Sequence, residues 1–358
     1  MSRSDPASAP TAVGEDKGGP CVLIAGVGGA SLGTEAVKSL LLAGRFRVAA
    51  ADVAPLAFGL HMPGMYGRSV LRSDRYIDDL LDCCHRLGVS AVVPGADATV
   101  HLVAAAADRL SAARVSCAIN RADVIAVCSD KAATFARLAA LGIPTPWTRA
   151  LAGPPDVDGL PLPCVIKPAT GTGGSSLVAL AASRAEALAH AGAIWSSGRV
   201  ALAQEYLPAD GGEFTVGVLT LGDWVGSVAM RREFPSKLSY VARGRDFIIS
   251  SGYSQGLIDD FPHVRMQAER IARLLGSRGP LNIQGRMRGD EFVPFEINPR
   301  VSASTHLRHL AGFPEIPMLV DFLLTGRAPD RQPEIRPGYY LRSLTETYVP
   351  RESVMAPA

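Results

Sequence analysis

The stretch NIQGRMRGDEFVPFEINPR, Asn282 to Arg300, decides how the rest of this sequence is interpreted. Its two halves have the residue types of β-strands, and Gly289–Asp290 between them is typical of a tight hairpin turn. In the second half apolar and polar residues alternate, and side chains two positions apart share one face of a strand. Glu296 and Asn298 are therefore expected on one face. The apolar residues are expected on the other: Val293, Phe295 and Ile297.

The polar face of this hairpin predicts a magnesium site. A ladder centred near Asp290 places Gln284 across from Glu296. The carboxylate of Glu296 and the amide oxygens of Gln284 and Asn298 are then expected to converge. Mg²⁺ prefers such oxygen ligands and leaves room for phosphates. Arg300 follows directly and is placed to neutralise charge on a transferring phosphoryl group. The alternative, a solvent-facing side of a hairpin, explains less well an acceptor face that ends in an arginine.

A second motif, PCVIKPATGTGGSS at residues 163–176, predicts contact with phosphates. Lys167 at a strand end can meet a phosphate as a point charge. The glycines that follow allow backbone N–H groups to close over phosphate oxygens. Because the lysine precedes the glycines, this is not a Walker A loop, and a flexible surface loop is the alternative. We favour phosphate binding, since hydroxyl side chains add donors. The loop residues expected to contact the phosphates are Gly171, Gly173, Gly174 and Ser175.

A third motif, AQEYLPADGGEFTVGV at residues 203–218, is compatible with adenosine binding. An adenine needs an apolar slot with backbone hydrogen bonds, and a ribose needs a carboxylate acceptor. Apolar residues flank Gln204, Glu205 and Tyr206, and Glu213 begins the next strand. A solvated loop between two strands would have a similar sequence.

The N-terminal third has the pattern of a parallel sheet covered by helices. Short apolar runs at 21–25, 47–51 and 91–94 alternate with amphipathic segments at 34–43 and 97–110. The turn GVGGASLG after the first run, with Asp52 ending the second, permits a dinucleotide site. The spacing is not GxGxxG, so we favour a Rossmann-like domain that binds no NAD.

The remaining segments complete an α/β chain with four parts. Helices are expected at 122–128, 131–141, 184–193 and 264–275, and strands at 164–167, 177–180, 200–206, 214–221 and 224–230. We expect a disordered tail at 1–19, a Rossmann-like domain at 20–120, a nucleotide-binding domain at 121–326 whose lid covers about 150–206, and a surface extension at 327–358.

The composition narrows the class of protein. The 358 residues are 47% hydrophobic and carry a formal charge of +2 with no long run of one sign, which argues against nucleic acid or an anionic membrane as a partner. The six cysteines form no CxxC motif, and most lie in apolar runs, where a reduced cysteine behaves as a small hydrophobic residue. No apolar run has membrane-spanning length and no secretory signal is present. We therefore expect a cytoplasmic protein.

From about Cys21 to about Phe322 the sequence resembles the ATP-grasp superfamily, and especially one synthetase unit of the carbamoyl phosphate synthetase large subunit. The motifs stand in the family's order. They are CSDKAATFARLAALGIPTP with Lys131, VIKPATGTGGSS, QEYLP with Glu213 beyond it, Gln284, and FEINPRVSASTHLRHLAGFP. The resemblance implies an ATP-grasp fold after a Rossmann-like pre-ATP-grasp domain.

The resemblance also implies roles for individual residues. Lys131, Lys167 and the glycine loop would contact ATP phosphates, and Arg300 would stabilise an acyl phosphate. Residues Gln204, Glu205, Tyr206 and Leu207 would form the adenine hinge, with Glu213 on the ribose. Gln284, Glu296 and Asn298 would bind Mg²⁺ or Mn²⁺.

The function implied is that of a ligase that activates a small carboxylate, such as an amino acid or metabolite acid, as an acyl phosphate for capture by an amine. Two alternatives stay open: an enzyme that releases an acyl or carbamoyl phosphate, and a non-catalytic ATP-binding module. A homodimer is common among relatives.

Two departures from the family bear on the substrate. Carbamoyl phosphate synthetase has a second arginine where this chain has Ala303, so less positive charge and a substrate bulkier than bicarbonate are expected. Biotin carboxylase has a Gln-Val-Glu cluster where residues 302–304 are Ser-Ala-Ser, which argues against biotin carboxylation. A basic segment supplies three further substrate candidates, Arg231, Arg232 and Lys237, although it equally suits a solvated hairpin. The last two candidates are Ser302 and His306, which follow Arg300 and either line the same pocket or cap a helix.

Overall fold

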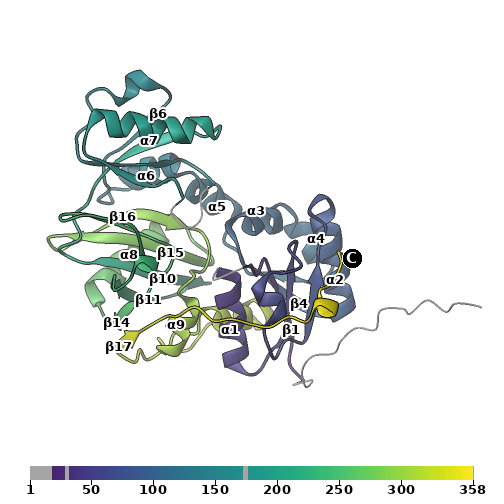
Figure 1. Cartoon of the computed structure of the whole chain (residues 1–358). Helices are drawn as coiled ribbons and strands as arrows, with labels where there is room; N and C mark the ends of the chain where they lie inside the picture. The colour runs from purple at the N-terminus through teal and green to yellow at the C-terminus, as the bar shows by residue number, and fades with distance from the viewer. Residues whose placement is uncertain (1–17, 29–31, 172–175, 358) are drawn as a thin grey trace, which may run out of the picture.

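The structure, a computed structural model, describes residues 18–28, 32–171 and 176–357. Its strands form three larger sheets and one two-stranded sheet, arranged in three parts (Figure 1). The N-terminal part is at the right of Figure 1, a small upper part at the top, and a part built on the largest sheet below it at the left.

The N-terminal part is a five-stranded parallel sheet in the order β3-β2-β1-β4-β5. Its strands are β1 (Cys21–Ala25), β2 (Arg47–Asp52), β3 (Gly67–Val70), β4 (Val89–Pro94) and β5 (Ser116–Cys117). Its helices are α1 (Leu32–Ala43), α2 (Tyr76–Leu87), α3 (Asp97–Ala105) and α4 (Ala107–Ala112), with short 3₁₀ turns η1 (Phe58–His61) and η2 (Ser73–Arg75).

The parallel sheet confirms the α/β prediction for this part, but three details differ, the first being helix α2, which was not predicted. The single helix expected over 97–110 is interrupted at Ala106, whose φ of −103° and ψ of 9° leave the helical range. Strands β3 and β5 were not predicted, because each is a short edge strand in which apolar residues are few.

The upper part is a four-stranded antiparallel sheet in the order β6-β9-β7-β8. The strands are β6 (Thr148–Leu151), β7 (Cys164–Pro168), β8 (Ala179–Ala181) and β9 (Ala201–Glu205). The accompanying helices are α5 (Ala122–Ser129), α6 (Lys131–Ala140) and α7 (Arg184–Ser196), with η3 (Pro154–Val157). Small and branched residues of α7 pack against this sheet: Ala187, Ala191 and Ile194.

The largest sheet has six antiparallel strands in the order β16-β15-β10-β11-β14-β17. They are β10 (Glu213–Leu221), β11 (Trp224–Arg232), β14 (Gly256–Asp259), β15 (Pro280–Arg288), β16 (Glu291–Asn298) and β17 (Gly338–Tyr340). A hairpin of β12 (Tyr240–Arg243) and β13 (Ile248–Ser250) follows η4 (Lys237–Ser239). The helices are α8 (Pro262–Leu274), α9 (Thr305–Leu310) and α10 (Glu315–Thr325), and η5 (Arg351–Ser353) lies near the C-terminus.

The β15–β16 hairpin confirms the predicted register. Gln284 lies opposite Glu296, and the turn contains Gly289 with φ of +58°, a left-handed conformation that glycine adopts without strain. A bulge follows Gln284, so that one residue of β16 has no partner across the ladder. This bulge corrects one expectation: Phe295 does not face the core with Ile297 but lines the same pocket as Glu296.

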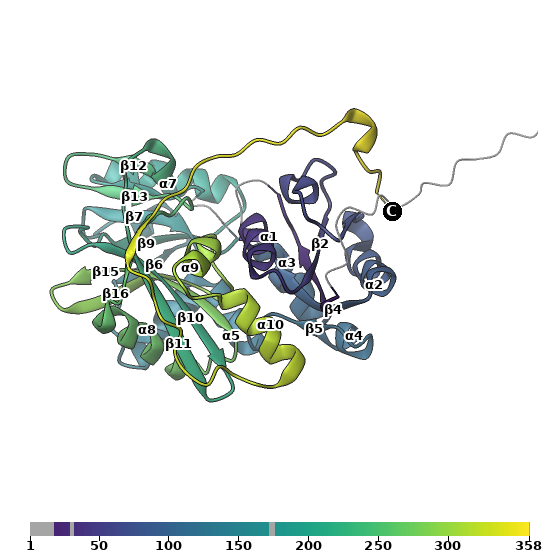
Figure 2. The same cartoon turned by 90° about the horizontal axis from the view of Figure 1, so that it is seen from below.

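The C-terminal extension is more structured than the expected surface stretch. Its strand β17 pairs with β14 at the edge of the largest sheet. The chain then runs back along the N-terminal part, as the yellow segment of Figure 2 shows. Within the described residues, no helix combines the length and the apolar character needed to cross a lipid bilayer.

Candidate functional site

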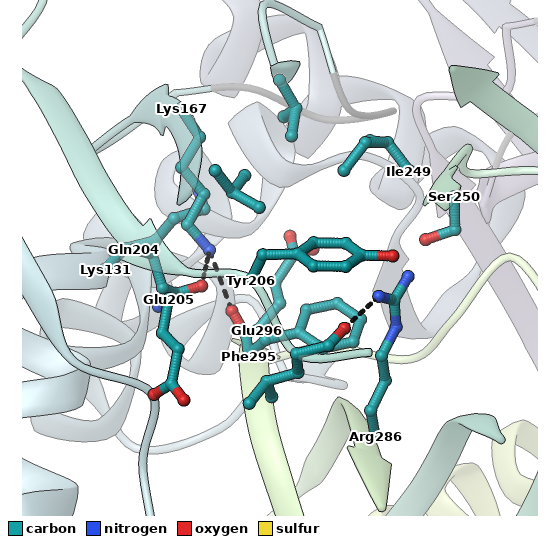
Figure 3. Close-up of a pocket in the computed structure, with 13 residues that line it drawn as sticks. Lys131, Lys167, Gln204, Glu205, Tyr206, Ile249, Ser250, Arg286, Phe295 and Glu296 are labelled. Carbon is teal, nitrogen blue, oxygen red and sulfur yellow. Dashed lines mark hydrogen bonds between the residues drawn. The ribbon is translucent and has the colours of Figure 1, made fainter. Parts of the chain in front are cut away.

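A pocket lies between the upper sheet and the largest sheet, and it brings together the two predicted phosphate-binding lysines, the predicted adenine hinge and Glu296 (Figure 3). Strands β7 and β9 line one side, and β15 and β16 line the other, with contributions from the start of α6 and from β13. The lining residues include Lys131, Lys167, Gln204, Glu205, Tyr206, Leu207, Arg286, Phe295 and Glu296.

Lys167 is a buried cation at the end of β7. Its Nζ donates hydrogen bonds to Gln204 Oε1 at 2.7 Å and to the carbonyl of Phe295 at 2.9 Å, and the side chain has no carboxylate partner among the described residues. Burial, together with the charge of Lys131, lowers the pKa of Lys167 to about 7, while the charge of Glu296 acts in the opposite direction. The pocket therefore offers a donor that a bound anion would hold in its charged form.

Lys131 begins helix α6 and lines the same pocket. Asp130 caps the helix, since its side chain accepts a hydrogen bond from the N–H of Ala133 at 3.0 Å. The backbone N–H of Lys131 donates to the carbonyl of Ala169, just beyond β7, at 3.0 Å. These contacts hold both predicted phosphate-binding lysines on rigid elements of the upper part.

The segment from Gln204 to Leu207 forms one wall of the pocket. Gln204 donates from Nε2 to Thr148 Oγ1 at 2.9 Å, which fixes its other amide atom toward Lys167. Tyr206 Oη accepts from the N–H of Ile248 at 3.0 Å and so ties this segment to β13. The remaining wall is apolar, as an adenine slot requires: Val165, Val178, Leu207, Ile249 and Phe295.

Glu213 does not line this pocket, which corrects the expected direct contact with a ribose. Its carboxylate is fully buried between two arginines: Oε1 accepts from Arg232 Nη1 at 3.1 Å, and Oε2 accepts from Arg286 Nε at 2.9 Å and Nη2 at 2.8 Å. Three hydrogen bonds from the two arginines hold this carboxylate, which borders the neighbouring cavity beside Tyr206 instead. Arg286 also donates to the carbonyls of Leu207 and Ile248, so Glu213 acts on the pocket through Arg286.

The predicted metal ligands lie on neighbouring strands of the largest sheet. Gln284 pairs with Glu296 across the ladder, and Asn298 follows two positions later on β16. Asn298 Nδ2 is buried without a hydrogen-bond partner, and none of the ion pairs among the described residues includes Glu296. Those residues contain no group of three or more His, Cys, Asp and Glu side chains able to hold a metal.

One carboxylate with two amides nevertheless fits Mg²⁺. That ion is usually held by one or two carboxylates together with substrate phosphates rather than by an all-protein cage.

Arg300 lies in an adjoining cavity between the N-terminal part and the largest sheet. Its Nε donates to Asp97 Oδ1 at 2.7 Å, and Asp97 is the first residue of α3. Burial opposes ionisation of Asp97, but the charge and hydrogen bond of Arg300, together with the charge of Lys131, hold the pKa of this carboxyl below its usual range. Lys131 and Asn298 also line this cavity, so it continues the nucleotide pocket.

Sequence reasoning missed the part played by Asp97 and His101, both of which line this adjoining cavity. The sequence contains no motif around them. They are recognised only in the structure, where the first turn of α3 faces the segment FEINPR, residues 295–300. Gly171, the first glycine of the predicted phosphate loop, also lines the cavity. The other predicted loop residues, Gly173, Gly174 and Ser175, lie outside the described residues.

The predicted basic substrate segment does not act as one surface. Arg231 is half-exposed, pairs with Glu233 at 3.6 Å and lines a third cavity next to Tyr206. Arg232 lines the same cavity, but its side chain is buried and paired with Glu213 at 3.1 Å. Lys237 is exposed in the 3₁₀ turn η4.

The two remaining candidates lie just beyond Arg300. Ser302 is buried, and its Oγ accepts from the N–H of Ser304 at 3.1 Å, which is a structural turn contact. His306 is partly buried in α9, and burial lowers its pKa. The carbonyl of Ala303 accepts a hydrogen bond from Arg342, so this position does have a guanidinium beside it, contrary to the lower positive charge expected.

Comparison with known proteins gives a partial family match and a set of similar structures. Residues 199–347 match the model of a family described as ATP-grasp in the biosynthetic pathway with Ter operon. A search of curated proteins finds no significant match to the sequence.

Three solved structures illustrate the likeness in fold. The L-amino acid ligase from Bacillus licheniformis is 15% identical, with a TM-score of 0.66 over 86% of this chain and 74% of that one. The N5-carboxyaminoimidazole ribonucleotide synthetase from Thermus thermophilus is 20% identical, with a TM-score of 0.62 over 87% and 81%. The biotin carboxylase domain of the Hydrogenobacter thermophilus 2-oxoglutarate carboxylase, in complex with MgADP, is 13% identical, with a TM-score of 0.61 over 87% and 71%.

Proposed function

Because the chain has the fold of the ATP-grasp superfamily, we propose that it is an ATP- and Mg²⁺-dependent ligase that activates a small carboxylate as an acyl phosphate and joins it to an amine. The single observation that carries this proposal is that one pocket holds both a buried Lys167 and Glu296, and that neither forms an ion pair with any of the described residues. A structural site would neutralise such a lysine, whereas a polyphosphate site leaves its positive charge for the ligand.

The lining of the pocket supports a position for the nucleotide. The adenine enters the apolar slot beside Tyr206 and Leu207, and the phosphates extend toward Lys131 and Lys167. Mg²⁺ held by Gln284, Glu296 and Asn298 would offset charge on the phosphates and orient them. The two lysines contribute fixed positive charge in a site with little water, where it counts most.

The chemistry proceeds in two balanced steps. An oxygen of the substrate carboxylate attacks the γ-phosphorus, the bond to the bridging oxygen breaks, and ADP leaves. The amine nitrogen then attacks the acyl carbon, inorganic phosphate leaves, and the amine loses a proton as the C–N bond forms. Arg300, in the cavity that continues the pocket, is placed to stabilise the acyl phosphate, and Asp97 orients its guanidinium.

The proposal extends to finer points that rest on the family resemblance. They are that Mn²⁺ can replace Mg²⁺, that the acyl phosphate is captured in place rather than released, that the protein works in the cytoplasm, and that it assembles as a homodimer. An acyl phosphate-releasing enzyme remains the alternative, and mass spectrometry of the product separates the two.

The test is ADP release in a screen of amino acids and small carboxylic acids with amine acceptors. Glu296→Gln should abolish the substrate-dependent release, because it removes the one carboxylate among the proposed metal ligands. Glu291→Gln is the matched control, since Glu291 lies exposed at the start of the same strand and should leave the rate unchanged. An unaltered rate in a folded Glu296→Gln protein would exclude the metal assignment.

A further inference from the structure

Arg342 in the C-terminal extension reaches into the protein just beyond the loop of Arg300. Its Nη2 donates to the carbonyl of Ala303 and pairs with Glu35 Oε2 at 3.2 Å. The guanidinium carbon lies 5.1 Å from the centre of the Tyr253 ring. Only 6% of the side chain is exposed. A cation from the end of the chain is thus buried between α1, the Arg300 loop and the segment before β14.

Several polar atoms around this guanidinium have no hydrogen-bond partner among the described residues. They are Arg342 Nε, Arg342 Nη1, Tyr253 Oη and His306 Nδ1, all buried. His306 lies in the first turn of α9, directly after the loop whose Ala303 carbonyl accepts a hydrogen bond from Arg342. Each buried unpaired group costs about 1–3 kcal/mol, and native proteins contain few of them. Their concentration at one place indicates that an acceptor belongs there.

The charge of the cluster indicates what kind of acceptor this is. Glu35 is its carboxylate, and both oxygens are occupied, Oε1 by Lys38 at 2.9 Å and Oε2 by Arg342. Two cations therefore face one anion. A neutral His306, favoured by burial, can donate from Nδ1, and Tyr253 can donate its hydroxyl. The unpaired atoms can all donate, which matches an oxyanion and not a cation or an apolar group.

We propose that Arg342, Tyr253 and His306 form a binding site for an oxyanion, a carboxylate or phosphate group carried by the substrate. This assignment of the ligand rests on the proposed ligase function, whereas the anion site itself rests on the geometry alone. The substrate then has two anionic ends. One is the carboxylate activated beside Arg300, and the other is anchored by the C-terminal extension. Ala303 connects the two ends, since it follows Arg300 in the same loop and its carbonyl accepts a hydrogen bond from Arg342.

The experiment measures anion binding without turnover. The thermal unfolding midpoint is followed while inorganic phosphate or acetate is titrated into the full-length protein saturated with ADP and Mg²⁺, so that Lys131 and Lys167 are already engaged. Arg342→Gln should lower the affinity for the anion at least tenfold, and Tyr253→Phe should lower it several-fold. Arg351→Gln is the matched control, because Arg351 is an exposed arginine of the same extension and should behave as wild type.

Tyr253→Phe separates a binding role from a structural one. It removes a buried hydroxyl that has no partner, so the protein without anion should be as stable as wild type or more stable. Only a bound anion makes the hydroxyl useful. A response to phosphate alone assigns a phosphoryl group, and a response to acetate alone assigns a carboxylate. Wild-type anion affinity in both Arg342→Gln and Tyr253→Phe would overturn the site.

The outcome also distinguishes this inference from the proposed function. Anion binding that depends on Arg342, without ADP release for any substrate, keeps the site and rejects the ligase. ADP release without Arg342-dependent anion binding keeps the ligase and rejects the site. Loss of the anion response in Lys167→Met but not in Arg342→Gln places the anion in the nucleotide pocket and also rejects the site.

Discussion

Lys167 gives the nucleotide pocket a pH dependence that can be measured. Its pKa is lowered to about 7 by burial and by the charge of Lys131, and a bound polyphosphate would raise it again. ATP binding at about one pH unit above that value should therefore take up close to one proton. Calorimetry in two buffers of different ionisation enthalpy measures this uptake, which should shrink about one unit below pH 7, where Lys167 is already protonated.

The control for this measurement is Lys167→Met, which should bind ATP more weakly and without proton uptake. Equal binding heats in both buffers on the alkaline side would contradict the assignment. The same pKa shift affects the empty protein. An unfolded lysine keeps its proton to about pH 10, so the unfolded chain binds more protons between about pH 7 and 10, and the contribution of Lys167 makes stability rise with pH across that window.

At the scale of single elements, the hairpin β15–β16 shows what the sequence could and could not predict. The two-residue alternation and the Gly289–Asp290 turn were enough to place Gln284 opposite Glu296. The bulge after Gln284 was not readable, because Phe295 fits an apolar position as well as it fits a pocket wall. Only the assembled sheet decides which way its ring points, toward the pocket and 5.8 Å from the guanidinium carbon of Arg286.

Glu213 illustrates the same limit on neighbouring strands. A carboxylate at a strand start is compatible with a ribose contact, but two arginines that are distant in sequence, Arg232 on β11 and Arg286 on β15, meet it in the sheet. No local pattern records which residues pair across antiparallel strands. The sequence therefore identified Glu213 as a candidate site residue, but it did not predict that Arg232 and Arg286 are its partners.

The buried group around Glu213 predicts a large effect on stability. Glu213→Gln leaves two buried guanidinium groups without a counter-charge and should lower the free energy of unfolding by about 3–5 kcal/mol, measured by denaturant titration. ATP affinity should fall too, since Arg286 holds the carbonyls of Leu207 and Ile248 at the pocket wall. Asp158→Asn, which breaks an exposed pair with Arg184, should change the free energy of unfolding far less. Comparable losses in both variants would refute the role given to the buried group.

At the scale of the whole molecule, segments that are far apart in sequence meet at Arg300 and the loop that follows it. The first helix contributes Glu35, the turn into α3 contributes Asp97, and the C-terminal extension contributes Arg342. Sequence motifs identified the nucleotide side of this centre, because phosphate and metal binding demand particular residues at fixed spacing. The second-substrate side comes from loops whose residues have no such pattern, and only the assembled fold brings them together.

The contact between Arg300 and Asp97 predicts how the N-terminal part takes part in the reaction. Asp97 lines the adjoining cavity but not the nucleotide pocket, so Asp97→Asn should leave ADP affinity unchanged. It should lower kcat/KM for the carboxylate about tenfold, or ~1.4 kcal/mol, because Arg300 loses the charged partner that orients it. Steady-state kinetics with ATP and carboxylate varied separately measure both effects. Asp108→Asn, on exposed α4, serves as the control. A parallel loss of ADP affinity would show that Asp97 supports the fold of the pocket rather than the orientation of Arg300.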